Sequence, residues 1–213
     1  MGIGLVERPG EAGEASVVET GARARAIEAT LRCVARYGAS KTTVDDVARE
    51  AKCSRATLYR AFPGGKDELM VAVVRSEVSR FFKVLARRMQ EAGNLEELLV
   101  AAISTAVAEV EGHEALSFLM LHEPELVWPH VAFSELDRVL ALAAAFVEPY
   151  LIDRLEPEHA RRIGEWVARI VISNVVCPPA SGSMDARSAQ RLVRNFLLPG
   201  IGELESRQAA RTA

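Results

Sequence analysis

The chain has 213 residues and a net charge of −3, and 49% of its residues are hydrophobic, enough to bury a sizeable core. No apolar run approaches the roughly 18–20 residues that span a bilayer. The first twenty residues also lack the basic start and apolar middle of a secretory signal. We therefore expect a globular protein of the cytoplasm without membrane contact.

The cysteines argue against two kinds of site. Cys33, Cys53 and Cys177 are odd in number and have no C-x-x-C spacing, which disfavours a disulfide framework or a zinc centre. Each is expected to be a small buried apolar residue, with a redox sensor as the alternative.

The charge is divided unevenly along the chain. Between Gly21 and Lys66 there are ten basic residues and four acidic ones, a net charge of +6 that leaves −9 for the remainder. A basic lobe on an acidic body suits a protein that presents one end to a polyanion and keeps the other away from it. A chance cluster of solvated charges is the alternative.

The first part of the chain is predicted to be an arm followed by a helix. Residues 1–19 are rich in glycine and glutamate and show no periodicity, so we expect a flexible arm. From about Thr20 the apolar residues recur at helical spacing, and Gly38 ends the pattern.

Two very short helices are expected next. Thr43 suits the N-cap of a helix over 44–51, and Ser54 suits the N-cap of another over 55–62. Isolated helices below about 12 residues are marginal in water. These two must therefore pack on the first helix, as the two helices of a helix-turn-helix.

The rest of the chain is predicted to be helical, without a convincing strand. Glycine and proline breaks, among them the segment 124–129, separate six further segments. We expect helices over 66–92, 94–111, 113–122, 133–150, 157–176 and 185–206. The predicted fold class is all-α, with a small domain over 20–66 and a larger helical domain over 67–213.

The second short helix is expected to have two distinct faces. Leu58 and Phe62, four residues apart, should point inward, with Ala61 beside them. The outward face, with Thr57 at its border, carries Arg55, Ala56, Tyr59 and Arg60. Arginine pairs with guanine, and a small residue allows close approach to a DNA major groove. An ordinary solvated helix face is the alternative.

Three motifs follow one another in an order typical of a known family. They are TTVDDVAREA at 42–51, SRATLYRAFP at 54–63 and KDEL at 66–69. Together they resemble the DNA-binding domain of the TetR-type (tetracycline-repressor-like) transcriptional regulators. The resemblance covers residues 22–69 in detail and the helical remainder loosely. It implies a helix-turn-helix DNA-binding domain over 20–66 and a ligand-binding and dimerisation domain over 67–213.

The resemblance also implies roles for individual residues. Thr43, Tyr59 and Lys66 would hold DNA phosphates, since a threonine cap and a lysine at a helix start lie near amides that attract anions. The residues expected against base edges or the nearby backbone are Ser54, Arg55, Ala56, Thr57 and Arg60. Lys41 and Arg23 or Arg25 would add nonspecific phosphate contacts.

The sequence departs from the family pattern in three places. Lys52 and Cys53 replace the usual Gly-Val, so we expect Lys52 in a left-handed turn at a cost of about 1 kcal/mol. Ala61 replaces the commoner histidine or aromatic residue. Gly64 and Gly65 make the connection to Lys66 one residue longer than usual.

A homodimer is expected, because one three-helix module has too little surface for specific DNA binding. The resemblance places the interface on the last two long helices. The candidates are Ile163, Trp166, Ile170, Val171, Leu192, Phe196 and Leu197. The alternative is that these side chains form an internal core.

The middle helices would surround a small-molecule effector. The candidate lining is apolar and aromatic with a few polar groups. It comprises His113, Phe118, Met120, Leu121, His122, Glu123, Trp128, Phe146, Tyr150 and Asn174. Plain core is the alternative for each aromatic residue, and Asn174 equally suits a residue that fixes dimer register.

No metal, cofactor or catalytic residue is predicted. The acidic and histidine residues of the middle segment lack a known ligand spacing. The predicted function is that of a regulator, most simply a repressor, released from a palindromic DNA operator when a largely apolar molecule shifts a two-state equilibrium. The helix from Lys66 would be the lever. The rivals are an effector-independent DNA-binding protein and an all-helical enzyme.

Overall fold

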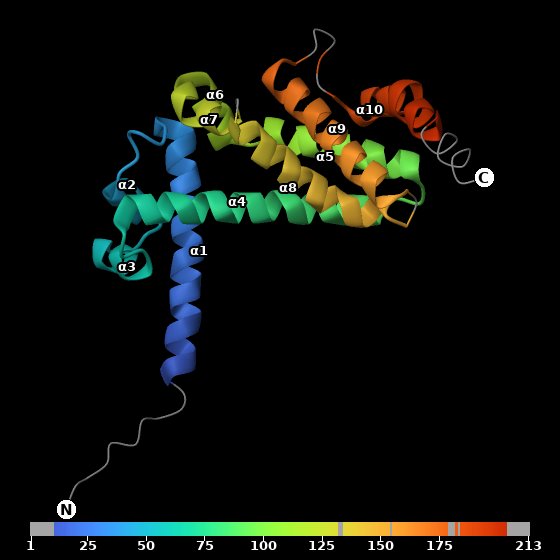
Figure 1. Cartoon of the computed structure of the whole chain (residues 1–213). Helices are drawn as coiled ribbons and strands as arrows, with labels where there is room; N and C mark the ends of the chain where they lie inside the picture. Colours follow the sequence, from blue (N-terminus) through green and yellow to red (C-terminus); the bar gives the residue numbers. More distant parts are fainter. Residues whose placement is uncertain (1–10, 132–133, 154, 179–181, 183, 204–213) are drawn as a thin grey trace, which may run out of the picture.

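The computed structural model describes residues 11–131, 134–153, 155–178, 182 and 184–203. Over these residues the chain is almost entirely helical and contains no strand, which confirms the all-α prediction (Figure 1). Within the same ranges, no helix has the length and apolar character needed to cross a membrane.

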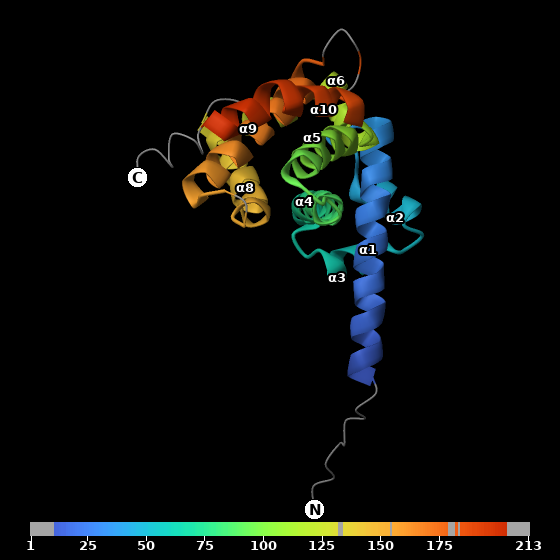
Figure 2. The same ribbon diagram turned by 90° about the vertical axis from the view of Figure 1, so that its right-hand side faces the viewer.

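The N-terminal lobe contains the three predicted helices: α1 (Glu11–Tyr37), α2 (Val44–Glu50) and α3 (Arg55–Ala61). Residues 11–19, expected to belong to a flexible arm, are helical and form the first turns of α1; residues 1–10 lie outside the described ranges. Ala and Glu are good helix formers, and they make up most of the segment that begins α1. α1 therefore extends as a rod past α3 (Figures 1 and 2).

A long helix connects the lobe to the rest of the molecule. α4 (Gly65–Gln90) places Leu69 and Val73 in the core of the lobe and Leu85 and Met89 in the core of the body. It crosses α1 and runs to the far side of the body (Figure 1). Any displacement of α4 therefore acts on both cores.

The body is built around a central helix, α5 (Leu95–Glu111), in which Leu99, Ile103 and Val107 are fully buried. The helix that contains Ala144 and the helix that contains Gly164 pack closely because position 164 is a glycine. A Cβ at Gly164 would lie 3.0 Å from the Cα of Ala144. The other elements of the body are α6 (Glu114–His122), α7 (Pro124–Val131), α8 (Ser134–Leu151), α9 (Pro157–Val176), α10 (Ala186–Leu192) and the π-helical turn η1 (Val193–Leu197).

Two of the later predictions need correction. The segment 124–129 was expected to be a break, but it forms most of α7. Pro124 occupies the first helical position, where a missing N–H costs nothing, and Pro129 stands inside the helix. The expected helix over 185–206 is observed over 186–203, but η1 gives its middle part π-helical geometry; residues 204–206 lie outside the described ranges.

The cysteines differ in exposure. Cys33 is buried in the core of the lobe, as predicted, and burial raises the pKa of its thiol. Cys53 is half-buried. Cys177 is exposed, so the buried-residue prediction is wrong there: it caps the C-terminus of α9, where the chain leaves the bundle.

Candidate nucleic-acid interface and ligand region

Helix α3 is held by its cap and by two buried side chains. The Ser54 hydroxyl accepts the N–H of Thr57 at 3.1 Å. Leu58 and Phe62 are 3% and 1% exposed, whereas Thr57 is half-buried. The residues on the outward face are all exposed: Arg55, Ala56, Tyr59 and Arg60. The predicted division of this helix into two faces is confirmed.

The turn before α3 has the strained geometry expected from the sequence. Lys52 has φ of 53°, in the left-handed region, which confirms the prediction made from the missing glycine. The N–H of Cys53 donates to the Ala48 carbonyl at 3.0 Å and closes the turn. This turn fixes the direction of α3 relative to α2.

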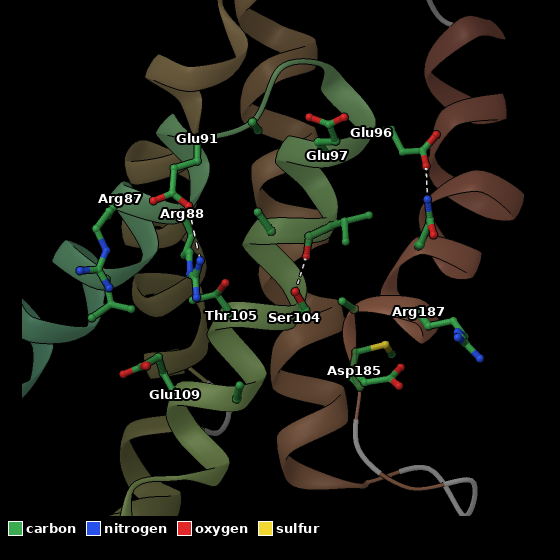
Figure 3. Close-up of a pocket in the computed structure, with 18 residues that line it drawn as sticks. Arg87, Arg88, Glu91, Glu96, Glu97, Ser104, Thr105, Glu109, Asp185 and Arg187 are labelled. Carbon is green, nitrogen blue, oxygen red and sulfur yellow. Dashed lines mark hydrogen bonds and ion pairs between the residues drawn. The ribbon is translucent and has the colours of Figure 1, made fainter.

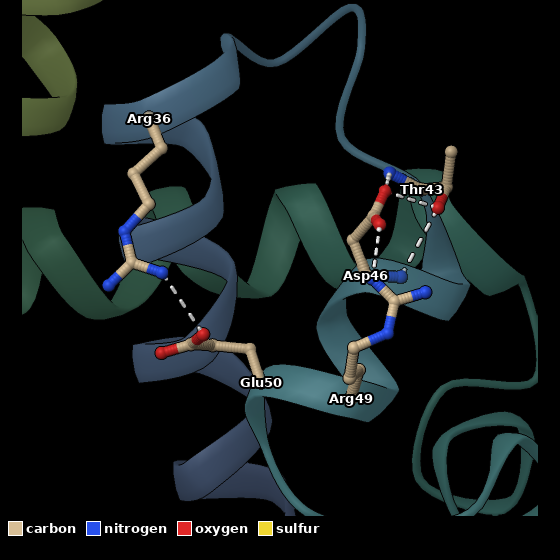
Figure 4. Close-up of polar contacts among 5 residues, drawn as sticks. All are labelled: Arg36, Thr43, Asp46, Arg49 and Glu50. Atoms are coloured by element: carbon tan, nitrogen blue, oxygen red, sulfur yellow. Dashed lines mark hydrogen bonds and ion pairs between the residues drawn. The ribbon is translucent and has the colours of Figure 1, made fainter.

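Thr43 caps α2 through a reciprocal set of hydrogen bonds with Asp46 (Figure 4). The hydroxyl of Thr43 accepts the N–H of Asp46 at 3.2 Å, while its backbone N–H donates to the Asp46 carboxylate at 3.1 Å. The hydroxyl also lies 2.5 Å from that carboxylate. These bonds hold the pKa of Asp46 below its ordinary value. If the Thr43 hydroxyl contacted a DNA phosphate, that contact would replace one of these hydrogen bonds to Asp46.

Two arginines of α1 hold the end of α2. Arg32 lies 2.6 Å and Arg36 3.2 Å from the carboxylate of Glu50, the latter pair visible in Figure 4. The hydrogen bond from Arg32, assisted by Arg36, keeps the pKa of Glu50 low against the opposing effect of burial. Part of the positive charge of the lobe is therefore paired with a carboxylate of the same chain.

Arg23, predicted as one of two possible nonspecific phosphate contacts, is also engaged internally. Its guanidinium lies 4.3 Å from the centre of the Phe62 ring and donates to the carbonyl of Ala61. It also lies 3.8 Å from Glu68 at the start of α4. Arg23 thus packs α1 against the end of α3.

The two arginines on the outward face of α3 differ in their surroundings. Arg55 lies 2.9 Å from Asp45 on α2, in an exposed ion pair. Arg60 is exposed and has no ion-pair partner in the described part of the chain. Arg60 can therefore reach a base edge without breaking an existing pair, whereas Arg55 must exchange Asp45 for DNA.

The additional glycine brings Tyr59 and the start of α4 together. Gly65 has φ of 65°, and a Cβ at this position would lie 3.4 Å from the ring of Tyr59. Lys66 follows in the first turn of α4, and its Nζ donates to the Ser40 carbonyl at 3.1 Å. The longer connection thus places Lys66 against the loop between α1 and α2.

The polar residues predicted for the ligand region have structural partners. His113 caps α6, with Nδ1 accepting the Leu116 N–H at 3.1 Å and Nε2 lying 3.1 Å from Glu77 on α4. The side chain of Asn174 donates to the Ile170 carbonyl of its own helix at 2.8 Å. Among the described residues, no three His, Cys, Asp or Glu side chains are grouped as a metal site would require.

The apolar residues predicted on α6 and α7 differ in exposure, and their role in a ligand site stays a prediction. The ring of Phe118 stacks on that of His122 with centroids 4.4 Å apart, Leu121 is 74% exposed, Met120 is half-buried and Trp128 is exposed. Glu123, expected beside them, instead points into the loop between α1 and α2.

Phe146 and Tyr150, both on α8, do lie together, in an aromatic cluster with α4. Phe146 is 4.5 Å from Phe82 and 5.8 Å from Tyr150 between ring centroids. The sequence did not point to Phe82, because it lies in the helix assigned as the lever. The signal in the sequence was a row of apolar residues that share one helix face with Phe82: Val71, Val74 and Val78. In the structure these three valines are exposed.

An open groove of about 940 Å³ lies elsewhere, between the end of α4, α5 and the start of α10 (Figure 3). Its walls are strongly charged, with Arg87, Arg88, Glu91 and Glu109 among them. None of the residues predicted for the ligand region lines it.

The candidates for a dimer interface divide into two groups. Trp166 is 59% and Phe196 75% exposed. Ile170 and Leu192 are half-buried against the body's core, and Ile163 belongs to that core. Trp166 and Phe196 are thus the candidates with most apolar surface left to bury, while Ile163 has almost none.

Comparison with known proteins relates both the lobe and the whole chain to transcriptional regulators. Residues 26–73 match the family model of bacterial regulatory proteins of the tetR family. An uncharacterized HTH-type transcriptional regulator of Mycobacterium tuberculosis is 26% identical over 176 residues, covering 82% of this chain and 83% of that protein. A similar regulator of Mycobacterium bovis is 26% identical over 182 residues, covering 85% and 79%.

Solved structures share the fold. A tetR-family transcriptional regulator from Streptomyces coelicolor superposes with a TM-score of 0.58 at 22% identity, over 90% of this chain and 89% of that one. The protein AibR, solved with isovaleryl coenzyme A and operator DNA, gives 0.51 at 16% identity, over 80% and 94%. The DNA-binding lobe therefore matches the tetR family of bacterial regulatory proteins, and the chain as a whole is similar to transcriptional regulators of that kind.

Proposed function

We propose that the chain is a repressor that binds a palindromic operator as a homodimer and leaves it when a small, largely apolar molecule binds the body. The observation that carries the proposal is the outward face of α3, anchored by Leu58 and Phe62 and joined to the body through α4. No catalytic step is part of this function.

In this proposal the residues of the lobe have separate tasks. Arg60 reads a base edge, since its guanidinium is exposed and unpaired within the described residues. Tyr59, Lys66 and Thr43 contact phosphates and set the register of α3. The remaining outward residues lie against the groove or the backbone: Ser54, Arg55, Ala56 and Thr57.

The proposed effector site is the apolar region where α4 meets α8. Phe82, Phe146 and Tyr150 form its aromatic part, and the row of valines ending at Val78 leaves apolar surface beside it. A molecule that prefers one of two arrangements of α4 shifts the equilibrium between them. The shift in free energy is no larger than the difference between its binding free energies for the two arrangements. A protein of the same fold, AibR, was solved with both an acyl coenzyme A and operator DNA.

The DNA part is tested by selecting bound sequences from a random duplex library. We expect a palindrome. Arg60→Ala should relax the preference at particular base pairs by about 1–3 kcal/mol. Lys66→Ala should weaken binding to all sequences equally. It should also reduce the slope of log affinity against log salt concentration by about 1. An equal loss at every position for Arg60→Ala would contradict its role as a base reader.

The effector part is tested by native mass spectrometry of the purified protein. We expect a copurified apolar molecule, and we expect that adding it weakens binding to the selected operator. Tight binding in calorimetry without any change of operator affinity would reject the coupling.

A further inference from the structure

The junction between α6 and α7 carries a carboxylate that reaches into the DNA-binding lobe. Glu123, the C-cap residue of α6, is buried. Its Oε2 accepts the backbone N–H of Ala39 at 2.7 Å, and the N–H of Ser40 donates to its two oxygens at 3.2 and 3.3 Å. A buried carboxylate is costly unless it is hydrogen-bonded, and here the loop between α1 and α2 supplies the donors.

The loop is shaped around this carboxylate. Gly38 has φ of +86°, a conformation that side chains disfavour, and a Cβ there would lie 2.6 Å from Oε1 of Glu123. The two amides that follow Gly38 form a concave anion site of the kind that successive backbone N–H groups make. Backbone conformation and available space therefore both require glycine opposite Glu123.

The same loop leads directly to two of the proposed phosphate contacts. The carbonyl of Ser40, whose N–H binds Glu123, accepts Nζ of Lys66 at 3.1 Å. The hydroxyl of buried Thr42 donates to the Gly38 carbonyl at 2.6 Å, and Thr43 begins the capping box of α2. One carboxylate of the body thus fixes the loop that orients the first turns of α2 and α4.

We propose that Glu123 is a positioning residue for DNA binding, which holds the loop between α1 and α2 so that Lys66 and Thr43 face the phosphates. This inference rests on the proposed DNA contacts of those two residues. A displacement of the end of α6 would withdraw the carboxylate and release the loop, which gives the body a second connection to the lobe besides α4.

Electrostatics supports the geometry. Burial opposes ionisation of Glu123, but the hydrogen bonds from Ser40 and Ala39 and the nearby charge of Lys41 outweigh it and keep the pKa below its ordinary value. The carboxylate is therefore ionised at neutral pH, the state that accepts hydrogen bonds most strongly.

The first test measures the contact without DNA. Amide hydrogen exchange is followed by NMR in the full chain, in Glu123→Ala and Glu123→Gln, and in Glu125→Gln, which removes an exposed charge two residues away. We expect Ala39 and Ser40 to be protected in the wild type and in Glu125→Gln, but to exchange at least tenfold faster in Glu123→Ala. Unchanged protection in Glu123→Ala would overturn the contact, whatever the protein does with DNA.

The second test asks whether the contact acts through Lys66. Against a selected operator, Glu123→Ala should bind about tenfold more weakly, the usual order for such couplings, with a salt slope reduced by about 1. Glu123→Gln, which keeps one acceptor oxygen, should fall between Glu123→Ala and the wild type. In a Lys66→Ala background, Glu123→Ala should cost less than it does in the wild type, because part of its effect acts through Lys66 and only the part that acts through Thr43 remains.

Three outcomes distinguish a failure of the positioning role from a failure of the proposed function and from general unfolding. Full additivity with Lys66→Ala, or an equal loss in Glu125→Gln, would overturn the positioning role. A wild-type protein that binds selected and random DNA equally would overturn the proposed function, and the positioning role with it. Rapid exchange confined to residues 39 and 40 in both Glu123 variants, with unchanged melting of the body, excludes general unfolding as the cause.

Discussion

The lobe and the body of this protein are held together in different ways. The core of the lobe is small and rich in alanine, and polar contacts fix its short helices in place: the Thr43 capping box, the pairing of Arg32 with Glu50, and Arg23 over Phe62. The core of the body is larger and almost entirely aliphatic. Short helices need such polar contacts because their apolar faces are too small to define one arrangement.

The two regions also differ in what they leave exposed. The lobe presents charged and polar groups on α3, whereas the body leaves large apolar side chains uncovered, Trp166 and Phe196 among them. Charged surface suits a polyanion, and uncovered apolar surface suits a second protein chain or an apolar molecule. This difference fits the tasks proposed for the two regions, DNA binding for the lobe and binding of a second copy or an effector for the body.

The largest expected effect comes from removing the one large aromatic side chain of the lobe's core. Phe62→Ala should destabilise the lobe by about 3–5 kcal/mol, because it leaves a cavity and removes the surface on which Arg23 lies. Hydrogen exchange resolved by helix should show faster opening of α1 to α3. Leu99→Ala in the body's core is the matched variant, and equal opening of both regions in each variant would mean that the molecule has a single cooperative core.

A smaller effect is expected at the exposed aromatic surface of the body. Trp166→Ala should leave the protomer folded, since the side chain is already 59% exposed, but should weaken the proposed dimer by about 2 kcal/mol or more. Sedimentation equilibrium measures the dissociation constant. Leu142→Ala, an exposed apolar change on α8, is the control, and a dimer weakened equally by both would remove α9 as the interface.

The sequence predicted the lobe in more detail than the body for a physical reason. In α3 the inward positions are determined by a helix of seven residues, one cap and one turn, so spacing alone assigned Leu58, Phe62 and the outward face. The positive φ of Lys52 was predicted from the family resemblance, because Lys52 stands where the family usually has glycine. The reach of Glu123 to Ser40 was hidden, since it joins residues that are 83 positions apart in the chain.

In the body, helix spacing gave the helices but not their neighbours. Ile163 and Trp166 stand three residues apart on one broad apolar face of α9, so position in sequence did not distinguish Ile163, buried in the core, from Trp166, which is exposed. Likewise, histidine is a residue type common in ligand sites, yet His113 serves as the N-cap of α6 and contacts Glu77. Only the packing of several helices decides between these roles.

A modest effect is expected from acid. The folded-state pKa of Glu50 lies below its ordinary value, so its contribution to stability is present above the ordinary pKa and is lost as the pH falls through the folded pKa. Glu50→Gln should therefore lower the free energy of unfolding at neutral pH and converge with the wild type in acid. Urea unfolding at a series of pH values measures this. Glu125→Gln controls for the change in net charge, and a constant difference at all pH values would contradict the role of the Arg32 and Arg36 contacts.

The smallest effect on stability should come from Asp45, whose exposed pair with Arg55 joins α2 to α3. Asp45→Asn should change the free energy of unfolding by less than about 1 kcal/mol, as is usual for surface pairs. It should nevertheless strengthen operator binding several-fold at low salt, because it removes a negative charge near the phosphates and leaves Arg55 available to DNA. The gain should diminish as salt screens the interaction. The matched variant is Glu91→Gln, which breaks the exposed pair with Arg88 in the body. It removes the same charge far from α3, so an equal gain in affinity there would show that net charge, and not the release of Arg55, controls the binding.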